Sequence, residues 1–391
     1  MLTDREIRQA VEKYNSPIYI FDIVELRRRI RSIREILGSE TEICFAMKAN
    51  PFLISYMDPL VDKFEVCSPG EYAICRKENI DAGKIVMSGV YKSEKDIEES
   101  FIEKFNGIYT IESMDQYRKI SDLAIRYHEE IQAVVRVTSG NQFGLDHKGV
   151  SQIISESAEN KFMDITGLHF FSGTQKKNLD LLRREIEALD SLCDYLDDAY
   201  GVKIRNIEYG AGLFYDYFGG GDDNYRDVRR LKEILVDYDK KYHFTIELGR
   251  YISASCGQYI TKVVDVKCNN GKNYCIVDGG IHHLNYHGQM LGIRVPKVHI
   301  LRGEHDDGKR EKWDVCGALC TVHDLLLKDF ETEKLHIGDI FVFDDAGAYS
   351  VTEAGYLFLS RDLPQIAVVD GEVELIRRSM SVSDINSRSC G

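Results

Sequence analysis

Short apolar runs rich in β-branched and aromatic residues recur along the first 250 residues, and segments with charged residues at helical spacing follow most of them. The segments 93–104 and 179–200 are two examples of such predicted helices. Because strands that alternate with helices are typical of parallel sheets covered by helices, we expect an α/β fold. The predicted strands are 43–48, 64–68, 85–88, 107–111, 133–137, 165–171, 204–210 and 244–248.

Eight strands of this kind favour a closed (β/α)8 barrel of the TIM type, although the alternation alone leaves an open, doubly wound sheet possible. After residue 255 the pattern changes to strands joined by turns, with little helix, and residues 17–22 also form a strand pattern ahead of a helix at 24–37. The later strands are predicted at 258–266, 274–277, 340–344, 365–369 and 373–377. We therefore predict a barrel over 25–255 and a C-terminal β-sandwich or β-barrel domain over 256–391 that includes the N-terminal strand of 1–24.

The composition narrows the class of protein without identifying it. Hydrophobic residues make up 43% and charged residues 29% of the 391 residues, which is ordinary for a soluble globular protein, and no apolar run is long enough to cross a membrane. The formal net charge of −14 argues against nucleic acid or an anionic membrane as a partner. Ten scattered cysteines without a CxxC pair, and an N-terminus without a signal peptide, predict free thiols and a cytoplasmic location.

The carboxyl ends of the predicted barrel strands carry the reactive side chains, where the active sites of such barrels lie. A lysine, a histidine, a glutamate, arginines and two glycine-containing loops converge on this rim. In chain order these residues are Lys48, Ser68, Gly70, Glu71, Arg136, His169, Ser172, Gly173, Gly210, Ala211, Gly212, Glu247, Gly249 and Arg250.

Each of these residues has a structural and a functional interpretation. Lys48 follows four apolar residues and is either an ion-paired rim residue or a desolvated amine able to form a Schiff base with an aldehyde. His169 alone is more typical of a satisfied structural histidine. Glycine loops after strands seven and eight lie where barrels commonly bind phosphate, and Arg250 would add a charge-assisted contact. Glu247, as a buried carboxylate, requires a cation, and the protonated ring nitrogen of pyridoxal would supply one.

With these residues in place, the chain resembles the fold-type III pyridoxal-phosphate decarboxylases, the group of diaminopimelate, ornithine and arginine decarboxylases. The resemblance runs over nearly the whole length and rests on several motifs in the same order. The matching segments are Phe45-Ala46-Met47-Lys48-Ala49-Asn50, Gly167-Leu168-His169-Phe170-Phe171-Ser172-Gly173, Gly210-Ala211-Gly212, Glu247-Leu248-Gly249-Arg250, Cys316-Gly317-Ala318-Leu319-Cys320 and Asp345-Ala346-Gly347-Ala348-Tyr349.

The resemblance implies pyridoxal 5'-phosphate as the cofactor and a role for each matching residue. Lys48 would hold the cofactor as a Schiff base, His169 would stack on its ring, and Ser172 and Tyr349 would contact its phosphate. The residues implied to support the lysine and the ring are Glu65, Glu71 and Arg136. The family forms head-to-tail homodimers with shared active sites, so Cys320 would protonate the carbanion in the neighbouring subunit's site after carbon dioxide leaves.

The sequence departs from the family pattern where the substrate is recognised. Relatives that act on basic amino acids carry an acidic residue after the catalytic cysteine, and this chain has Thr321, although Asp324 or Glu353 could substitute. The segment 277–283 resembles family members that act on carrier-protein-tethered or siderophore-type substrates. The predicted substrate is therefore an amino acid or an amino-acid conjugate, with a carrier protein as a possible partner.

Three alternatives stay open at this stage. An alanine-racemase-like enzyme would place an arginine against the ring nitrogen, so Glu247 and Cys320 count against it. A catalytically dead binding protein would not need Lys48 or His169. His282, His283 and His287 invite a metal site, but no carboxylate partner is obvious near them, and we predict no metal.

Overall fold

The computed structural model describes residues 2–219, 225–303 and 308–388, and the described chain forms two compact units. The chain enters the first unit at Arg29 and leaves it after Tyr251, with a short excursion that begins at Asp216. We call this unit the barrel unit. The chain up to Arg28, the excursion and the chain from Ile252 onward form the second unit, which we call the β unit.

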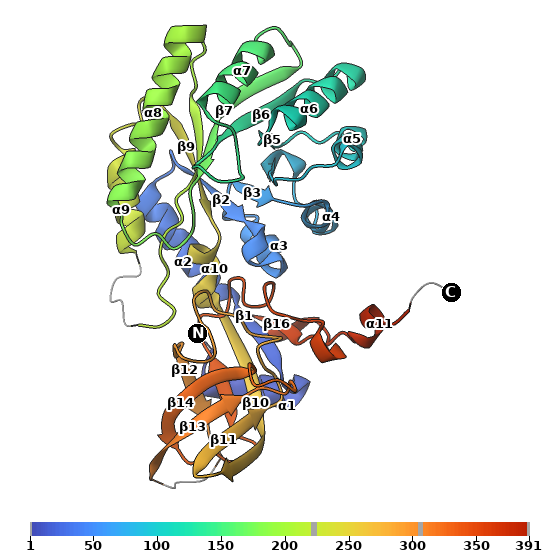
Figure 1. Cartoon of the computed structure of the whole chain (residues 1–391), viewed down its shortest axis with the longest axis vertical. Helices are drawn as coiled ribbons and strands as arrows, with labels where there is room; N and C mark the ends of the chain where they lie inside the picture. Colours follow the sequence, from blue (N-terminus) through green and yellow to red (C-terminus); the bar gives the residue numbers. More distant parts are fainter. Residues whose placement is uncertain (1, 220–224, 304–307, 389–391) are drawn as a thin grey trace. The chain divides into compact units, whose positions relative to one another are not determined.

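Eight parallel strands close into a barrel in sequence order in the barrel unit (Figure 1). This closure confirms the (β/α)8 barrel and excludes the open, doubly wound sheet. The ring closes where the first strand pairs in parallel with the last. The strands are β2 (Glu42–Ala46), β3 (Lys63–Val66), β4 (Ile85–Met87), β5 (Ile108–Ile111), β6 (Ile131–Val137), β7 (Met163–Phe171), β8 (Asn206–Gly210) and β9 (His243–Leu248).

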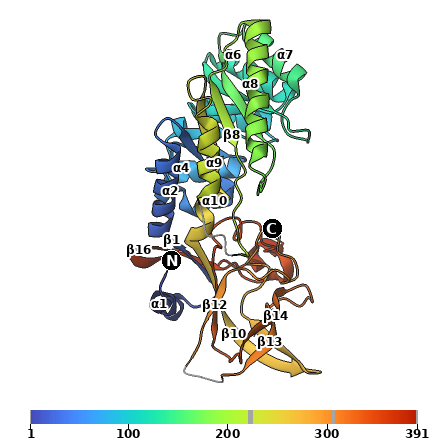
Figure 2. The same ribbon diagram turned by 90° about the vertical axis from the view of Figure 1, so that its left-hand side faces the viewer.

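Helices cover the outside of the barrel, and Figures 1 and 2 show α6, α7 and α8 against the outer face of its strands. Side chains at the helix starts fix several of the loops, because Ser68, Ser93, Ser113 and Asp146 each accept a hydrogen bond from a backbone N–H of the first helical turn. The helices are α2 (Ile23–Leu37), α3 (Ile54–Met57), α4 (Pro69–Lys77), α5 (Glu94–Ile102), α6 (Met114–Tyr127), α7 (His147–Ser157), α8 (Asp180–Tyr200), α9 (Arg226–Leu235) and α10 (Arg250–Ser253).

The first barrel strand is shorter than its apolar pattern predicts. β2 ends at Ala46, and the chain turns at once into a 3-10 helix over Met47–Ala49, followed by a second over Pro51–Leu53. The side chain of Asn50 accepts a hydrogen bond from the backbone N–H of Phe52 at 3.1 Å and so starts the second turn. Lys48 therefore lies on a turn at the carboxyl end of β2 and not on the strand itself.

The β unit contains a mixed sheet, and its membership confirms that the N-terminal strand belongs to the β domain. β1 (Ile18–Asp22) pairs antiparallel with β10 and parallel with β16. Among the described residues the sheet runs β14-β13-β11-β10-β1-β16-β17, and β15 pairs with both β10 and β12. The other strands are β10 (Gly257–Asn269), β11 (Lys272–Val277), β12 (Val298–Leu301), β13 (Arg310–Cys316), β14 (Leu325–Glu333), β15 (Ile340–Phe343), β16 (Gln365–Asp370) and β17 (Glu372–Arg377).

A helix that the hydrophobic pattern did not predict, α1 (Asp4–Tyr14), packs on this sheet. Thr3 and Glu6 form a capping box at its start, because each side chain accepts a hydrogen bond from the other residue's backbone N–H. Ile7 and Val11 of α1 join a core cluster with Ile18 and Ile20 of β1. A short helix, α11 (Ser383–Asn386), follows the last strand of the sheet in the sequence. No helix of the described residues is long and apolar enough to span a membrane.

Candidate active site

Lys48 lies at the carboxyl end of β2 with its ammonium group against a buried carboxylate. The Lys48 side chain is 41% exposed, so it is half-buried and not enclosed as the apolar run before it suggested. Its Nζ atom forms an ion pair with Glu65 of β3, whose side chain is only 5% exposed. Lys48 Nζ also lies 3.5 Å from Cys67 Sγ. An amine in this position is open to a small molecule on one side and held by an anion on the other.

The loop beside Lys48 is organised by Glu71, at the start of α4. The backbone N–H of Cys67 donates to Glu71 Oε2 at 2.6 Å, and the backbone N–H of Glu71 donates to Ser68 Oγ at 3.2 Å. Burial raises the pKa of Glu71, while the Cys67 hydrogen bond acts in the opposite direction. Glu71 therefore holds the loop that places Cys67 beside the lysine. Cys67 was not among the predicted site residues, because a single cysteine after a strand carries no sequence signal.

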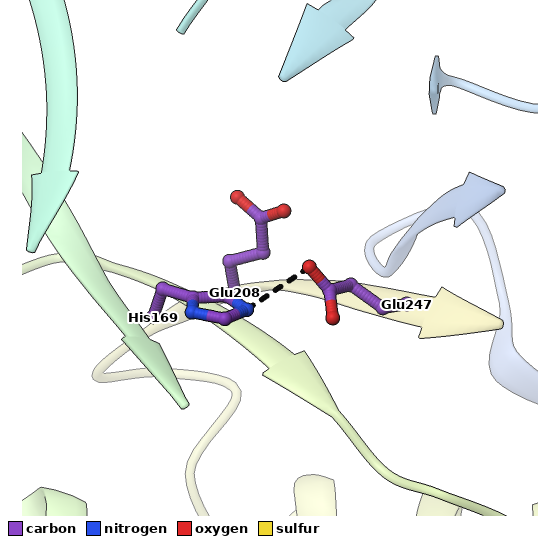
Figure 3. A group of neighbouring side chains, drawn as sticks. All are labelled: His169, Glu208 and Glu247. Carbon is purple, nitrogen blue, oxygen red and sulfur yellow. Dashed lines mark hydrogen bonds and ion pairs between the residues drawn. The ribbon is translucent and has the colours of Figure 1, made fainter. Parts of the chain in front are cut away.

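His169 of β7 and Glu247 of β9 meet inside the barrel, as Figure 3 shows. His169 Nε2 lies 3.0 Å from Glu247 Oε1, and both side chains are almost fully buried. Burial alone would raise the pKa of Glu247, but His169 and Lys48 outweigh that effect and hold it well below its usual value. His169 Nδ1 has no hydrogen-bond partner among the described residues. The pair thus presents a buried anion next to a flat, polar ring.

A second carboxylate, Glu208 of β8, completes this cluster in Figure 3. Polar atoms of His169, Glu208 and Glu247 lie within 4.8 Å of one another, and this is the one group of metal-ligand type found among the described residues. His282 and His283 of the β unit form no such group there. Glu208 was not among the predicted residues, because a glutamate inside a barrel strand gives no sign of its neighbours before the register is known.

Arg136 of β6 forms the side of the site next to His169, with which it pairs across β6 and β7. Its guanidinium group lies 3.1 Å from the carboxylate of Glu112 and 4.8 Å from the centre of the Phe143 ring. Arg136 and Glu112 are both buried, so the ion pair fixes the arginine inside the barrel. Neither Glu112 nor Phe143 was predicted as a partner.

Gly210, the last residue of β8, and Gly212 just after it are packed so closely by neighbouring protein atoms that neither position has room for a side chain. A Cβ atom on Gly210 would lie 2.5 Å from the Phe171 ring and 2.9 Å from Glu247 Oε2. Gly212 has a φ of +58°, and a Cβ there would lie 2.0 Å from the carbonyl oxygen of Gly173. Ala211 between them is fully buried. After β9, Gly249 leads directly into buried Arg250 at the start of α10.

The Ser172 hydroxyl, on the loop after β7, donates a hydrogen bond to Glu185 of α8. Glu185 also accepts from Tyr209 and lies 2.7 Å from Lys176 Nζ in a buried ion pair. The backbone N–H of Lys176 donates to the carbonyl oxygen of Gly212 at 2.9 Å. This network ties the loop after β7 to the loop after β8. Its members Glu185 and Lys176 became visible only through the structure.

The site residues predicted in the C-terminal half lie in the β unit. Cys320 is exposed, and the Thr321 hydroxyl lies 3.3 Å from His323 Nδ1. Asp324 is buried, and its carboxylate accepts hydrogen bonds from the backbone N–H groups of Ile281 and Leu319 at 2.8 and 2.7 Å.

Glu353 and Tyr349 differ from Asp324 in their surroundings. Glu353 is exposed, lies 3.4 Å from Asn285 Nδ2 and lines a cavity of about 290 Å³ with His323 and Gln289. Tyr349 follows β15 with a φ of +64°, a strained conformation that is concentrated at functional sites.

The barrel residues fit the chemical demands of pyridoxal phosphate. The aldehyde requires an amine, and Lys48 offers one at the rim. The ring requires a flat neighbour and an anion for its nitrogen, which His169 and the buried Glu247 provide. The phosphate requires backbone N–H groups that few side chains cover, and two of the three residues over 210–212 at the end of β8 are glycines.

Comparisons with known proteins agree with this chemistry. Residues 23–254 match the family model described as pyridoxal-dependent decarboxylase, pyridoxal binding domain. The L-glutamyl-[BtrI acyl-carrier protein] decarboxylase of Niallia circulans is 27% identical, and the match covers 98% of this chain and 96% of the relative.

A second relative acts on a different kind of molecule, and one solved structure has the same fold. The 2-[(L-alanin-3-ylcarbamoyl)methyl]-2-hydroxybutanedioate decarboxylase of Staphylococcus aureus is 24% identical over 89% of this chain and 92% of the relative. The diaminopimelate decarboxylase of Helicobacter pylori, solved with L-lysine, superposes with a TM-score of 0.85 at 21% identity over 97% of this chain and 98% of that chain. The chain therefore belongs to the pyridoxal-dependent decarboxylases, which are carboxy-lyases, and its cofactor is pyridoxal phosphate.

Proposed function

We propose that this protein removes the α-carboxylate of an amino acid or an amino-acid conjugate, with Lys48 holding the cofactor and Cys320 of a partner subunit donating the proton. The observation that carries the proposal is the pairing of two features in one barrel, an amine on the rim and a buried glutamate anion against a histidine. An anion at Glu247 suits a ring nitrogen that must stay protonated. A racemase-like enzyme would not need that anion.

The residues of the barrel unit divide the work of binding. Glu65 keeps the Lys48 amine in place at the rim, and Glu71 fixes the loop beside it. His169 stacks against the ring. Arg136 supports His169 from the neighbouring strand.

A second set of residues, described next, binds the phosphate group of the cofactor. Backbone N–H groups around Gly210, Ala211 and Gly212 bind the phosphate, since this segment carries no side chain larger than a methyl group. Ser172, Gly249 and Arg250 complete the contacts from the barrel unit, and Tyr349 completes them from the partner subunit.

The bound cofactor supplies an electron sink for the pair of electrons left at the α carbon when carbon dioxide departs. Glu247 supports that role by remaining anionic inside the barrel, where burial alone would favour its neutral form. Cys320 then delivers a proton to the α carbon. Its exposure in the single chain is what a residue acting in another subunit's site requires. We accordingly propose a homodimer with shared active sites, located in the cytoplasm.

The substrate is proposed to be conjugated or tethered to a carrier protein, with a free amino acid as the second candidate. Thr321 offers no negative charge to a distal ammonium group. The Asp324 carboxylate is occupied by two backbone N–H groups, which leaves the exposed Glu353 as the acid able to meet a substrate. The relative from Niallia circulans, whose substrate is a glutamyl group on a carrier protein, supports the tethered candidate.

The test combines a visible absorbance spectrum with an assay of carbon dioxide release. Purified protein with pyridoxal phosphate should show the absorbance band of the lysine-linked cofactor. Release would then be measured from free diaminopimelate, lysine, ornithine, arginine and glutamate, and from glutamate loaded on an acyl-carrier protein. Release from the loaded carrier alone supports a tethered substrate, and release from one free amino acid supports the second candidate. A protein without the band, or one that inverts the α carbon without releasing carbon dioxide, contradicts the proposal.

A further inference from the structure

Glu208 is a buried carboxyl group whose role is not explained by contact with the ring or with the phosphate. It lies on β8 with a residue exposure of 3%, and it pairs with His169 of β7 on one side and Thr245 of β9 on the other. The side chain of Glu247 comes from the position opposite Gly210, two residues further along β8. Because Gly210 has no Cβ, Glu247 can reach over β8 toward Glu208.

Carboxylate oxygens of Glu208 and Glu247 lie within 4.8 Å of each other in the barrel interior. Two carboxyl groups at that distance, away from water, cannot both carry a charge, so one proton is shared between them. Glu247 lies 3.0 Å from His169 Nε2, and His169 and the Lys48 ammonium at the rim both lower its pKa. Glu208 instead has Glu247 and Glu65 as neighbours, with Lys63 as its cation, and one of its oxygens, Oε1, has no hydrogen-bond partner among the described residues. Burial first and Glu247 second raise the pKa of Glu208 well above its usual value. The shared proton therefore belongs on Glu208.

We propose that Glu208 is a positioning residue whose protonated carboxyl group donates a hydrogen bond to Glu247 and keeps Glu247 as the single anion facing the cofactor. This inference rests on the proposed role of Glu247. A hydrogen bond from a neutral donor fixes the direction of the Glu247 carboxylate without neutralising it. It also explains how a barrel can hold two adjacent glutamates, because only one of them is charged.

A divalent cation at His169, Glu208 and Glu247 is the competing explanation of the same cluster. Such a cation would need both carboxylates ionised. The proton-sharing arrangement instead needs one of them protonated. The two explanations therefore predict different protonation states for Glu208.

The first experiment measures protonation directly by infrared spectroscopy of the holoenzyme at pH 8. A carbonyl stretch of a protonated carboxyl group should be present in the wild type and absent from Glu208→Gln. Glu156→Gln is the control, since Glu156 is an exposed glutamate of α7 in the same unit. The band should survive in that control. A wild type without the band, or a band that survives in Glu208→Gln, overturns the proposal.

The second experiment separates hydrogen bonding from charge. Glu208→Leu removes the donor, so kcat should fall about tenfold with a smaller change in KM, and the cofactor should dissociate more readily. Glu208→Gln keeps a neutral donor and should rescue most of that loss, with an unchanged pH profile of kcat. A Gln variant as impaired as the Leu variant, or tight zinc or manganese binding by the apoprotein that Glu208→Gln abolishes, would overturn the proposal. If Glu247→Gln itself has no effect, the proposed role of Glu247 has failed, whatever the Glu208 variants do.

Discussion

The two units differ in the burial of the ionisable side chains proposed for the site. In the barrel unit three polar residues of the candidate site lie against a buried carboxylate: Lys48 against Glu65, Arg136 against Glu112 and His169 against Glu247. In the β unit Cys320 and Glu353 are exposed. The barrel unit therefore organises the cofactor half of the site within a single chain. The proposed proton donor Cys320 and the proposed substrate contact Glu353 are exposed instead, so cofactor binding and proton delivery should be separable by mutation.

The largest effect should come from Lys48→Ala, which removes the amine that we propose holds the cofactor. We expect kcat to fall by about 10³-fold or more, because the covalent link would be lost. The absorbance band of the lysine-linked cofactor should disappear as well. Borohydride reduction followed by peptide mapping of the wild type checks the assignment, since the cofactor tag should lie on Lys48.

Lys92 is the control for that experiment. It follows β4, and burial lowers its pKa to about 8, which brings its amine closer to the neutral form that a Schiff base requires. Its ammonium group already donates to the carbonyl oxygens of Gly89 and Thr110 at 2.7 and 2.8 Å. A tag on Lys92 would contradict the role of Lys48 and move the site to the next strand end.

Hydrophobic periodicity was enough to predict all eight barrel strands, because buried parallel strands are nearly continuous apolar runs. It failed for α1 and for β12, β13 and β14. Those three strands are short or exposed on one side, and β13 (Arg310–Cys316) begins with three charged or polar residues. The assignment of β12 and β13 also depends on pairing with β15 and β11, which are not their neighbours in the sequence.

The candidate site shows the same division between local and long-range information. Lys48, His169 and Glu247 could be found because they are unusual residues inside apolar strands or directly after them. Glu112, Glu185 and Glu208 could not be found, since each acts through a partner on another strand or helix. A glutamate has many possible roles until the strand register specifies its neighbours.

Glu247→Gln should produce the next largest loss of kcat, and it tests whether the buried negative charge in the barrel unit is needed for activity. Replacing the buried anion by a neutral amide should lower kcat by about 10²-fold while the cofactor remains bound. Glu247→Asp keeps the charge and should recover part of the activity. Kinetics of both variants at saturating cofactor would decide the point. Equal activity of Gln and wild type would remove the anion from the mechanism.

Cys320→Ala should leave cofactor binding intact and lower kcat by about 10²-fold, since only proton delivery is impaired. Cys268, another exposed cysteine of the β unit, provides the matched control as Cys268→Ala. The absorbance spectrum should be unchanged in both variants. Loss of the cofactor band in Cys320→Ala would show that the two halves of the site are not separable.

Mixing subunits tests whether the two halves come from different chains. Inactive Lys48→Ala and weakly active Cys320→Ala would be unfolded together, refolded and assayed. If sites are shared, half of the dimers contain one site with both native residues, so about a quarter of the wild-type activity should return. Activity that stays at the sum of the two parents would place Lys48 and Cys320 in the same chain's site.

The smallest effect concerns acid sensitivity and arises in the β unit. His282 is 1% exposed, neither of its ring nitrogens has a hydrogen-bond partner among the described residues, and its ring centre lies 3.8 Å from that of His283. Burial lowers the pKa of His282 to about 3 and that of His283 to about 4. His169 of the barrel unit, by contrast, lies against the carboxylate of Glu247.

The sign of the effect follows from which state binds more protons. Unfolded histidines titrate near pH 6.5. Between that pH and about pH 4, His282 and His283 therefore bind protons in the unfolded chain but not in the folded β unit. The contribution of these two histidines to the free energy of unfolding is therefore fully present above about pH 7 and is lost as the pH falls from about 6.5 to about 4. His282→Phe removes one of the two histidines that take up a proton only on unfolding. The fall in Tm between pH 7 and pH 5 should therefore shrink by about 2–4 °C. The exposed neighbour His323, replaced by Gln, should leave the fall in Tm unchanged. An identical fall in His282→Phe and wild type would show that His282 is protonated in the folded protein, and the β unit would then hold a buried cation that its surroundings must neutralise.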